Sequence, residues 1–308
     1  MHGGDRAAAA MTQAPLGPPS TPSPSGTPGS SGTPGLPGTP GRPARSRWAG
    51  LAPLRTSLGL FTVIPVRASP AIDAGDAARA VLWLPVVGAL LAVPAVGVLL
   101  AVQAGGDSTP RGLLAAALAI GVLALLTGGL HLDGLADTAD GLGSRRPRDE
   151  ALAIMRRSDI GPFGVAALIF AVLIQITALA TVSPGWPAAA AVAAAAVTGR
   201  VAVVLATGPG SPPARPDGFG ALVAGATTAR ARVRAAVLLL ALVSGAAALA
   251  WGLLPALRGA AAVLAGLLAA DLLRRVAKRR LGGMTGDVFG ALIEVSAAAV
   301  LLTLAVAS

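Results

Sequence analysis

Seven apolar runs constrain the fold of this chain more than any other feature. They lie at about residues 81–103, 111–130, 160–182, 187–207, 234–254, 259–273 and 290–307. Most approach the ~20 residues that a helix needs to cross a ~30 Å hydrocarbon core, although the sixth run is short. Since a chain inside lipid must satisfy its backbone hydrogen bonds internally, we expect these runs to be helices. The predicted fold is an all-α, polytopic integral membrane bundle with about seven transmembrane helices.

Composition agrees with this fold and excludes several classes of function. The chain is 54% hydrophobic and 12% charged, outside the usual range of soluble domains. The absence of cysteine excludes disulfides and thiolate metal sites, and two histidines leave little for zinc. Hard cations with oxygen ligands, such as Mg²⁺, remain possible. Aromatic residues are only 3% and no nucleic-acid motif is present, so membrane topology explains the net charge of +10 better than nucleic-acid binding does.

Two segments precede the first run. Residues 1–47 are rich in Pro, Gly, Ser and Thr, and they bury too little apolar area to offset their ordering entropy, so we expect a disordered tail. Residues 51–67 are apolar but too short to span, which favours an interfacial or re-entrant segment. The membrane-embedded, catalytic part of the chain is therefore expected to be residues 48–308.

Basic residues orient the predicted bundle, because they gather in alternate connections. The N-terminal region and three long connections carry Arg42, Arg45, Arg47, Arg55, Arg67, Arg145, Arg146, Arg148, Arg156, Arg157, Arg215, Arg230, Arg232, Arg234, Arg274, Arg275, Lys278, Arg279 and Arg280, whereas the other connections carry only Arg111 and Arg258. By the positive-inside rule, the N-terminus and the three long loops face the cytoplasm across the cell membrane, and the C-terminus lies outside. Both acidic motifs described below, and the loop 208–225, then open on the same side.

The densest group of acids follows the second run. If the backbone is helical here, Asp133, Asp137 and Asp140 fall within an arc of about 60° and share one face. A solvated helix end, balanced by the arginines that follow, is one explanation. The other is a platform for Mg²⁺, since carboxylates at this spacing repel one another unless a cation offsets them. His131 falls nearly opposite the acids, where it could pack or contact substrate; spacing alone does not make it a general base.

A second acidic motif, GGMTGD at residues 282–287, precedes the last run and is followed by Glu294. An unpaired carboxylate inside a span is costly, so Asp287 and Glu294 are further candidate metal ligands. We interpret the two acidic motifs as halves of one site. Asp271 has a simpler explanation, a local ion pair with Arg274 and Arg275 near the end of its run.

Two arginines are candidates for holding phosphate. Arg200 lies inside the fourth run without a local partner, so it could pair with an acid or with a substrate phosphate. Arg156 lies between the acids and the glycine turn at residues 160–164. A metal ion together with a cationic clamp is the arrangement that phosphoryl transfer needs.

These motifs resemble the cobalamin synthase family. The resemblance rests on GLHLDGLADTADG at residues 129–141, IMR at 154–156 with IGPFG at 160–164, and GGMTGD at 282–287 with GA at 290–291 and Glu294. Weaker similarities are FT at 61–62 with Pro65, Pro85 with Gly88, and RPDGFG at 215–220. Two positions depart from the pattern: Val63 stands where the family often has Arg, and Arg157 where an acid is common.

The resemblance covers residues from about 51 to the C-terminus and implies a Mg²⁺-dependent membrane enzyme. Such an enzyme joins adenosylcobinamide-GDP to α-ribazole or its 5′-phosphate, which releases GMP and forms adenosylcobalamin or its phosphate. The candidate catalytic residues are Asp133, Asp137, Asp140 and His131; the candidate substrate-binding residues are Arg156, Arg200, Arg215 and Thr285; the candidate metal ligands are Asp133, Asp137, Asp140, Asp287 and Glu294. The expected partners are the two substrates and the lipid bilayer.

Two other functions remain open at this point. A CDP-alcohol phosphotransferase also uses Asp-rich helices at the membrane boundary, but that family places Arg where this chain has Asp137, and no later Gly-x3-Asp-x3-Asp run appears. A secondary transporter would explain Asp271, Glu294 and Arg200 inside spans. Transporters, however, usually show internal repeats, and this chain shows none.

Overall fold

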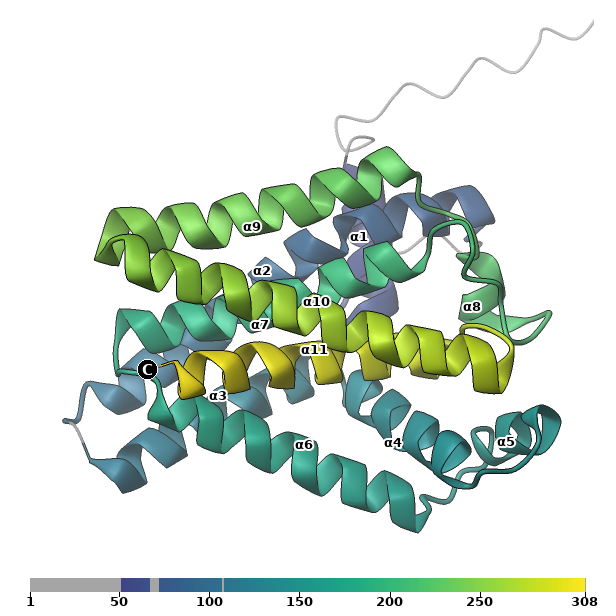
Figure 1. Ribbon diagram of the computed structural model, residues 1–308, viewed down its shortest axis with the longest axis horizontal. Coiled ribbons are helices and arrows are strands. Elements are labelled where there is room, and N and C mark those ends of the chain that lie inside the picture. The colour runs from purple at the N-terminus through teal and green to yellow at the C-terminus, as the bar shows by residue number, and fades with distance from the viewer. Residues whose placement is uncertain (1–50, 67–71, 107, 308) are drawn as a thin grey trace, which may run out of the picture. The chain divides into compact units, whose positions relative to one another are not determined.

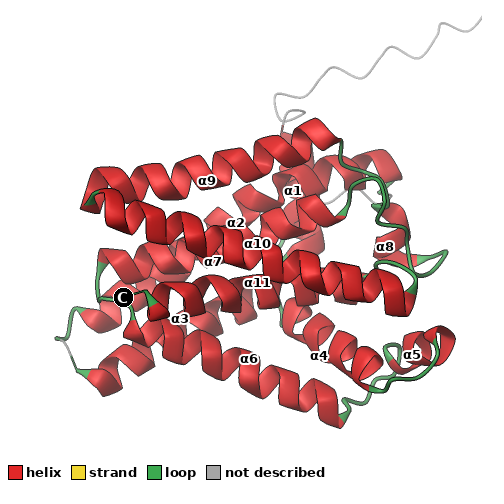
Figure 2. Cartoon of the chain, viewed as in Figure 1, coloured by secondary structure: helices red, strands yellow, loops and turns green. Residues whose placement is uncertain are grey.

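The computed structural model describes residues 51–66, 72–106 and 108–307. In these ranges every regular element is a helix, as Figure 2 shows, and the only β pairing is an isolated bridge between Pro213 and Met284. The helices are α1 (Ala52–Phe61), α2 (Ala74–Gln103), α3 (Thr109–Leu126), α4 (Leu130–Gly143), α5 (Arg148–Ile154), α6 (Pro162–Thr181), α7 (Trp186–Ala206), α8 (Gly218–Leu222), α9 (Ala229–Trp251), α10 (Leu253–Leu281) and α11 (Gly286–Val306). The predicted disordered tail, residues 1–47, lies outside the described residues.

Seven of these helices are long and apolar enough to cross a membrane, which confirms the predicted class: α2, α3, α6, α7, α9, α10 and α11. α1 has 10 residues, or about 15 Å of helix, so it is too short to span; it packs against α2. This matches the prediction of a short N-terminal segment that does not cross.

The sixth run was predicted too short, and this prediction is wrong. α10 continues for 29 residues, so Arg274, Arg275, Lys278, Arg279 and Arg280 lie on its last two turns rather than in a connection. Similarly, Arg230, Arg232 and Arg234 lie within α9. Hydropathy ends where charged residues begin, but a helix need not end there, and cations in the last turn of α10 interact favourably with its dipole. As predicted, Asp271 accepts hydrogen bonds from Arg274 and Arg275, the closest at 2.6 Å.

The centre of the bundle is α7, the most buried of the seven spans. Alanine dominates its sequence, so that α2, α10 and α11 can approach it closely (Figure 1). By contrast, α9 is the least buried span and exposes Val237, Leu238 and Leu242. Such a face suits contact with lipid.

The long connections gather at one end of the bundle, the right-hand end in Figure 1. There the Pro212–Ala214 segment pairs with Met284 through two backbone hydrogen bonds, each of 2.9 Å. Arg148 joins both segments to α5, because it donates to the carbonyls of Leu281 (3.0 Å) and Ala214 (2.6 Å). This confirms that both acidic motifs and the 208–225 loop open on the same side. The connections at the opposite end include residues 182–185 and the single residue Gly252.

Candidate functional site

A tight turn between α3 and α4 sets the position of the first acidic motif. Gly128 and Gly129 have φ angles of 60° and 74°, a left-handed conformation that residues with a Cβ rarely adopt. The turn lets α4 begin at Leu130 and pack against α11 and α6. At the contact with α11, a Cβ at Gly134 would lie 2.6 Å from the carbonyl oxygen of Asp287. The two acidic motifs are therefore in direct backbone contact.

Asp133, Asp137 and Asp287 form an acidic row along this contact. The pKa of Asp137 is raised to about 6, first by burial and then by repulsion from Asp133, Asp287 and Asp140, while Arg215 opposes the shift. Arg215 therefore reduces the shift of the Asp137 pKa but does not cancel it. Among the described residues, no three His, Asp or Glu side chains lie close enough together to enclose a metal ion.

Arg215 and Thr285 border the acidic row. Arg215 lies 3.9 Å from the Asp287 carboxylate and donates to the Leu152 carbonyl at 2.8 Å. Thr285 caps α11, since its Oγ1 accepts from the Val288 N–H at 3.2 Å and lies 3.2 Å from the Asp287 carboxylate. Thr285 therefore orients Asp287 in this structure.

The Asp140 carboxylate is engaged by the loop before α6 and does not belong to the row. It accepts hydrogen bonds from the backbone N–H groups of Gly161 (2.7 Å) and Gly164 (2.8 Å), so it caps the N-terminus of α6. A Cβ on either glycine would collide with this carboxylate. The shared face predicted for the three acids is thus divided: two carboxylates belong to the row, and the third holds the loop that precedes α6.

We expect Asp140→Ala to destabilise the protein by about 1–2 kcal/mol, as loss of a helix cap does. Because the Asp140 carboxylate is hydrogen-bonded to the backbone of Gly161 and Gly164, we do not expect it to bind Mg²⁺. The Mg²⁺ concentration that gives half-maximal activity should therefore change little. The measurements are the melting temperature in detergent and a Mg²⁺ titration of activity. Asp133→Asn serves as the comparison, since it removes charge from the row without touching this cap; a large shift in Mg²⁺ requirement for Asp140→Ala would contradict the assignment.

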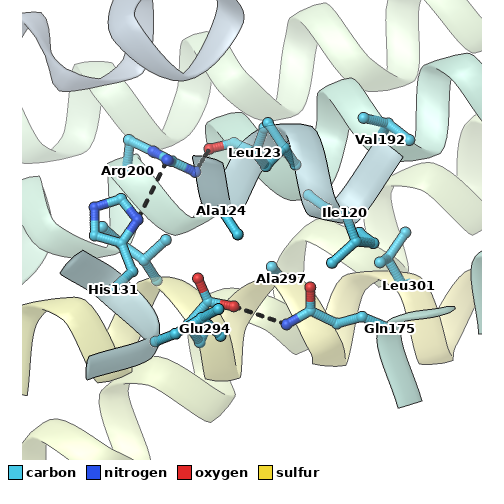
Figure 3. A pocket seen from close by; sticks show the side chains of 14 residues that line it. Ile120, Leu123, Ala124, His131, Gln175, Val192, Arg200, Glu294, Ala297 and Leu301 are labelled. Atoms are coloured by element: carbon cyan, nitrogen blue, oxygen red, sulfur yellow. Dashed lines mark hydrogen bonds between the residues drawn. The ribbon is translucent and has the colours of Figure 1, made fainter. Parts of the chain in front are cut away.

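A second polar group lies deeper in the bundle (Figure 3). His131, Gln175, Arg200 and Glu294 come from four helices, α4, α6, α7 and α11, and line a cavity of about 30 Å³. That volume holds at least one water molecule. Arg200 lies 3.4 Å from His131 Nδ1, and Gln175 donates to Glu294 at 2.8 Å. We refer to these four residues as the buried polar cluster.

Charges within the buried polar cluster offset one another. Glu294 is the acid that attracts the fully buried Arg200. Burial lowers the pKa of His131 well below its usual value, and the charge of Arg200 acts in the same direction, so His131 is neutral at pH 7. His131 Nε2 has no hydrogen-bond partner among the described residues. The structure therefore groups His131, Arg200 and Glu294 with one another rather than with Asp137.

An open cleft of about 730 Å³ adjoins the acidic row. Asp133 and Asp137 line one side of it, and the loop before α6 and the segment after α1 complete it. Arg156 is not among its lining residues; it pairs with Asp217 at 3.1 Å, and both side chains are largely exposed. The cleft is the space in which a ligand can reach the acids from outside the bundle.

Known proteins resemble this chain over most of its length. The family model described as cobalamin-5-phosphate synthase matches residues 53–305. The chain belongs to this family. Proteins named adenosylcobinamide-GDP ribazoletransferase from Frankia casuarinae and Bradyrhizobium diazoefficiens are 45% and 40% identical to it; the alignments cover 82% and 83% of the chain and 93% and 94% of those relatives. A protein of that name from Citrobacter koseri is 38% identical over 78% of the chain. No solved structure matches.

In this member of the cobalamin-5-phosphate synthase family, sequence reasoning missed three site residues. Gln175 is a lone amide within an apolar run, and that isolation is a usable signal. Arg148 was interpreted only as a topology signal, although it ties three segments together. Asp217, the partner of Arg156, lies in the RPDGFG motif at 215–220, but that motif alone assigned it no role.

Proposed function

We propose that the chain is an adenosylcobinamide-GDP ribazoletransferase, an enzyme of cobalamin (vitamin B12) biosynthesis. It joins adenosylcobinamide-GDP to α-ribazole, or to its 5′-phosphate, and forms adenosylcobalamin, or its phosphate, and GMP. The observation that carries this proposal is the family match over residues 53–305, together with an acidic row that borders an open cleft. Neither a CDP-alcohol phosphotransferase nor a transporter has comparable support.

The reaction is a phosphoryl transfer. A hydroxyl oxygen of the ribazole forms a bond to the phosphorus next to cobinamide, the bond from that phosphorus to the bridging oxygen breaks, and GMP leaves with the electron pair. The hydroxyl proton is lost, and Asp133 and Asp137, the carboxylates of the acidic row that line the cleft, can accept it. Arg215, which lies beside Asp287, is placed to attract the diphosphate.

We propose Mg²⁺ as the cofactor, held by one or two of the carboxylates of Asp133, Asp137 and Asp287. Mg²⁺ needs only one or two protein carboxylates, because substrate phosphates and water complete its coordination. The observation behind this fit is the set of donors: Asp133 and Asp137 line the cleft, and the backbone of Asp287 contacts Gly134 between them. Bound there, the ion would neutralise charge that develops on the diphosphate. Asp140 and Glu294 are engaged elsewhere, by the α6 cap and by Gln175.

The direct test is incubation of the purified protein in lipid nanodiscs with adenosylcobinamide-GDP and α-ribazole. We expect GMP and adenosylcobalamin in equal amounts, and product only when Mg²⁺ is present. Omission of either substrate is the control. Hydrolysis of the donor at the same rate without ribazole would argue against ribazole transfer.

The acid limb of the pH profile reports on Asp137. The pKa of Asp137 is raised to about 6 by burial and by repulsion from Asp133, Asp287 and Asp140, so the folded protein retains a proton that the unfolded chain loses at lower pH. Activity that needs this carboxylate should fall as the pH drops through about 6, and higher Mg²⁺ should move the midpoint down because metal competes with the proton. The measurement is kcat/KM from about pH 5 to 8 at two Mg²⁺ concentrations. Asp133→Asn should also lower the midpoint; a profile that is flat through pH 6 would refute the role.

We place the protein in the cell membrane with the basic loops in the cytoplasm, an orientation that rests on the positive-inside rule. The native chain has no cysteine, so single cysteines can be introduced at positions 145 and 278. We expect both to react with a membrane-impermeant maleimide only after lysis. A cysteine at Ser183, an exposed position in the connection between α6 and α7 at the opposite end, is the matched control and should react in intact cells. The reverse pattern would invert the topology.

A further inference from the structure

The cleft has two chemically different walls. One is the acidic wall formed by Asp133 and Asp137. The other is an apolar wall that spans three segments of the chain: Leu60 in the last turn of α1 with Val63 just after it, Leu130 at the start of α4, and Ile160 just before α6 with Leu168 within it. Between the two walls there is room for a small organic molecule, because pockets that hold drug-sized ligands measure about 300–1,000 Å³.

The apolar wall is exposed where the surrounding surface is polar. Val63 is 58% exposed, Leu130 46% and Ile160 51%. Ile160 directly follows Arg157, Ser158 and Asp159, all of which also line the cleft. A patch of exposed apolar residues with polar residues around it is typical of a binding site.

Hydrogen bonds and close packing hold the apolar wall in place. The Val63 N–H donates to the Leu126 carbonyl at 2.9 Å, which fixes the segment after α1 against the end of α3. A Cβ at Gly128 would lie 2.7 Å from Val63 Cγ1, so this glycine leaves the space that Val63 occupies. The opposite part of the wall is held by the Asp140 cap on α6. The wall is thus preformed.

We infer that the cleft binds the aromatic nucleoside acceptor, with its base on the apolar wall and its ribose hydroxyls toward Asp133 and Asp137. This inference rests on the proposed function, and it specifies which substrate occupies which space. The base of α-ribazole is a dimethylbenzimidazole, which carries no hydrogen-bond donor. Contact with an apolar wall therefore leaves no buried donor without a partner. Ribose hydroxyls can donate to carboxylates, so the orientation matches both walls.

The other substrate does not suit this space. Adenosylcobinamide-GDP carries a corrin macrocycle, an adenosyl group and a guanosine diphosphate, and is several times larger than a nucleoside. Amide side chains surround its corrin ring, and they would lose hydrogen bonds on an apolar wall. Only its diphosphate needs to approach the acidic row, where Arg215 lies beside Asp287.

Filling the cleft with a larger side chain tests the inference. The variant is Leu168→Trp, which narrows the apolar wall; the matched control is Val165→Trp, on the same helix and exposed but outside the cleft. The measurements are the Kd of α-ribazole by equilibrium dialysis on protein in nanodiscs, and the KM of each substrate. We expect Leu168→Trp to raise the Kd and KM of α-ribazole at least about tenfold, while the KM of adenosylcobinamide-GDP stays within about twofold and Val165→Trp resembles wild type.

Ile160→Ser is the second variant, because Ile160 is exposed and its replacement leaves the core intact. We expect it, too, to weaken α-ribazole binding selectively. Unchanged α-ribazole binding in both variants, or a rise confined to the KM of adenosylcobinamide-GDP, would overturn the inference while leaving the proposed function intact. Conversely, wild-type protein that binds α-ribazole in a manner sensitive to both variants but makes no GMP would refute the proposed function and keep the binding site.

Discussion

Replacement of Asp137 with Asn is expected to lower kcat at least about 100-fold, the loss typical when one preorganised electrostatic group is removed from an active site. Asp137 is the residue that joins the two parts of the site: it lines the cleft and interacts electrostatically with Asp133, Asp287 and Arg215. An amide preserves its shape but carries no charge with which to hold a cation or accept a proton. The measurement is GMP release at saturating substrates and Mg²⁺.

The melting temperature distinguishes a catalytic loss from misfolding. Since burial and like charges oppose the ionised form of Asp137, Asp137→Asn should melt at the same temperature as wild type or higher. Asp149→Asn is the matched control, because Asp149 is 92% exposed on α5 and outside the cleft. Full activity of Asp137→Asn would remove Asp137 from the site.

The second large effect concerns the buried polar cluster. Glu294→Gln and Arg200→Met each leave one buried charge without the opposite charge that attracts it; because no direct ion pair joins the two side chains, we expect the lower end of the ~3–5 kcal/mol seen for buried pairs. For a bundle of this size, 3 kcal/mol corresponds to a decrease in melting temperature of about 6–12 °C. The double variant removes both charges and is expected to recover at least half of that loss. The measurement is a double-mutant cycle on melting temperature in detergent.

Arg280→Met provides the control for charge removal, because Arg280 is exposed near the end of α10. It should change the melting temperature by no more than about 1 °C, as surface substitutions usually do. Additive losses in the double variant would show that Arg200 and Glu294 do not compensate each other. In that case each would need a separate role.

Local sequence patterns predicted the seven spans and the neighbouring positions of Asp133 and Asp137. Apolar runs located the seven spans because hydropathy depends on each residue and its neighbours alone. The positions of Asp133 and Asp137 on one helix face follow from helical geometry, and the gathering of both acidic motifs at one end follows from the alternation of basic connections. The ion pair of Asp271 with its own helix was predictable for the same reason.

Contacts between distant segments could not be predicted in this way. Asp140 shares the helical face of Asp137, but its carboxylate accepts hydrogen bonds from the backbone N–H groups of Gly161 and Gly164. Glu294 lies seven residues after Asp287 on the same helix. It is therefore further along α11, outside the row and beside Gln175 and Arg200. Which acid meets which partner is decided by the packing of α4, α6 and α7 on α11.

The gathering of the long connections at one end also bears on the side of the membrane from which substrates enter and products leave. Both acidic motifs, the cleft and the paired loops share that end, and the described connections at the other end include turns as short as Gly252. We therefore expect substrates and products of the proposed reaction to arrive and depart on the same side, with no step that carries a charge across the bilayer. Catalysis should be non-vectorial, so that dissipating the transmembrane potential of sealed vesicles with an ionophore leaves its rate unaltered.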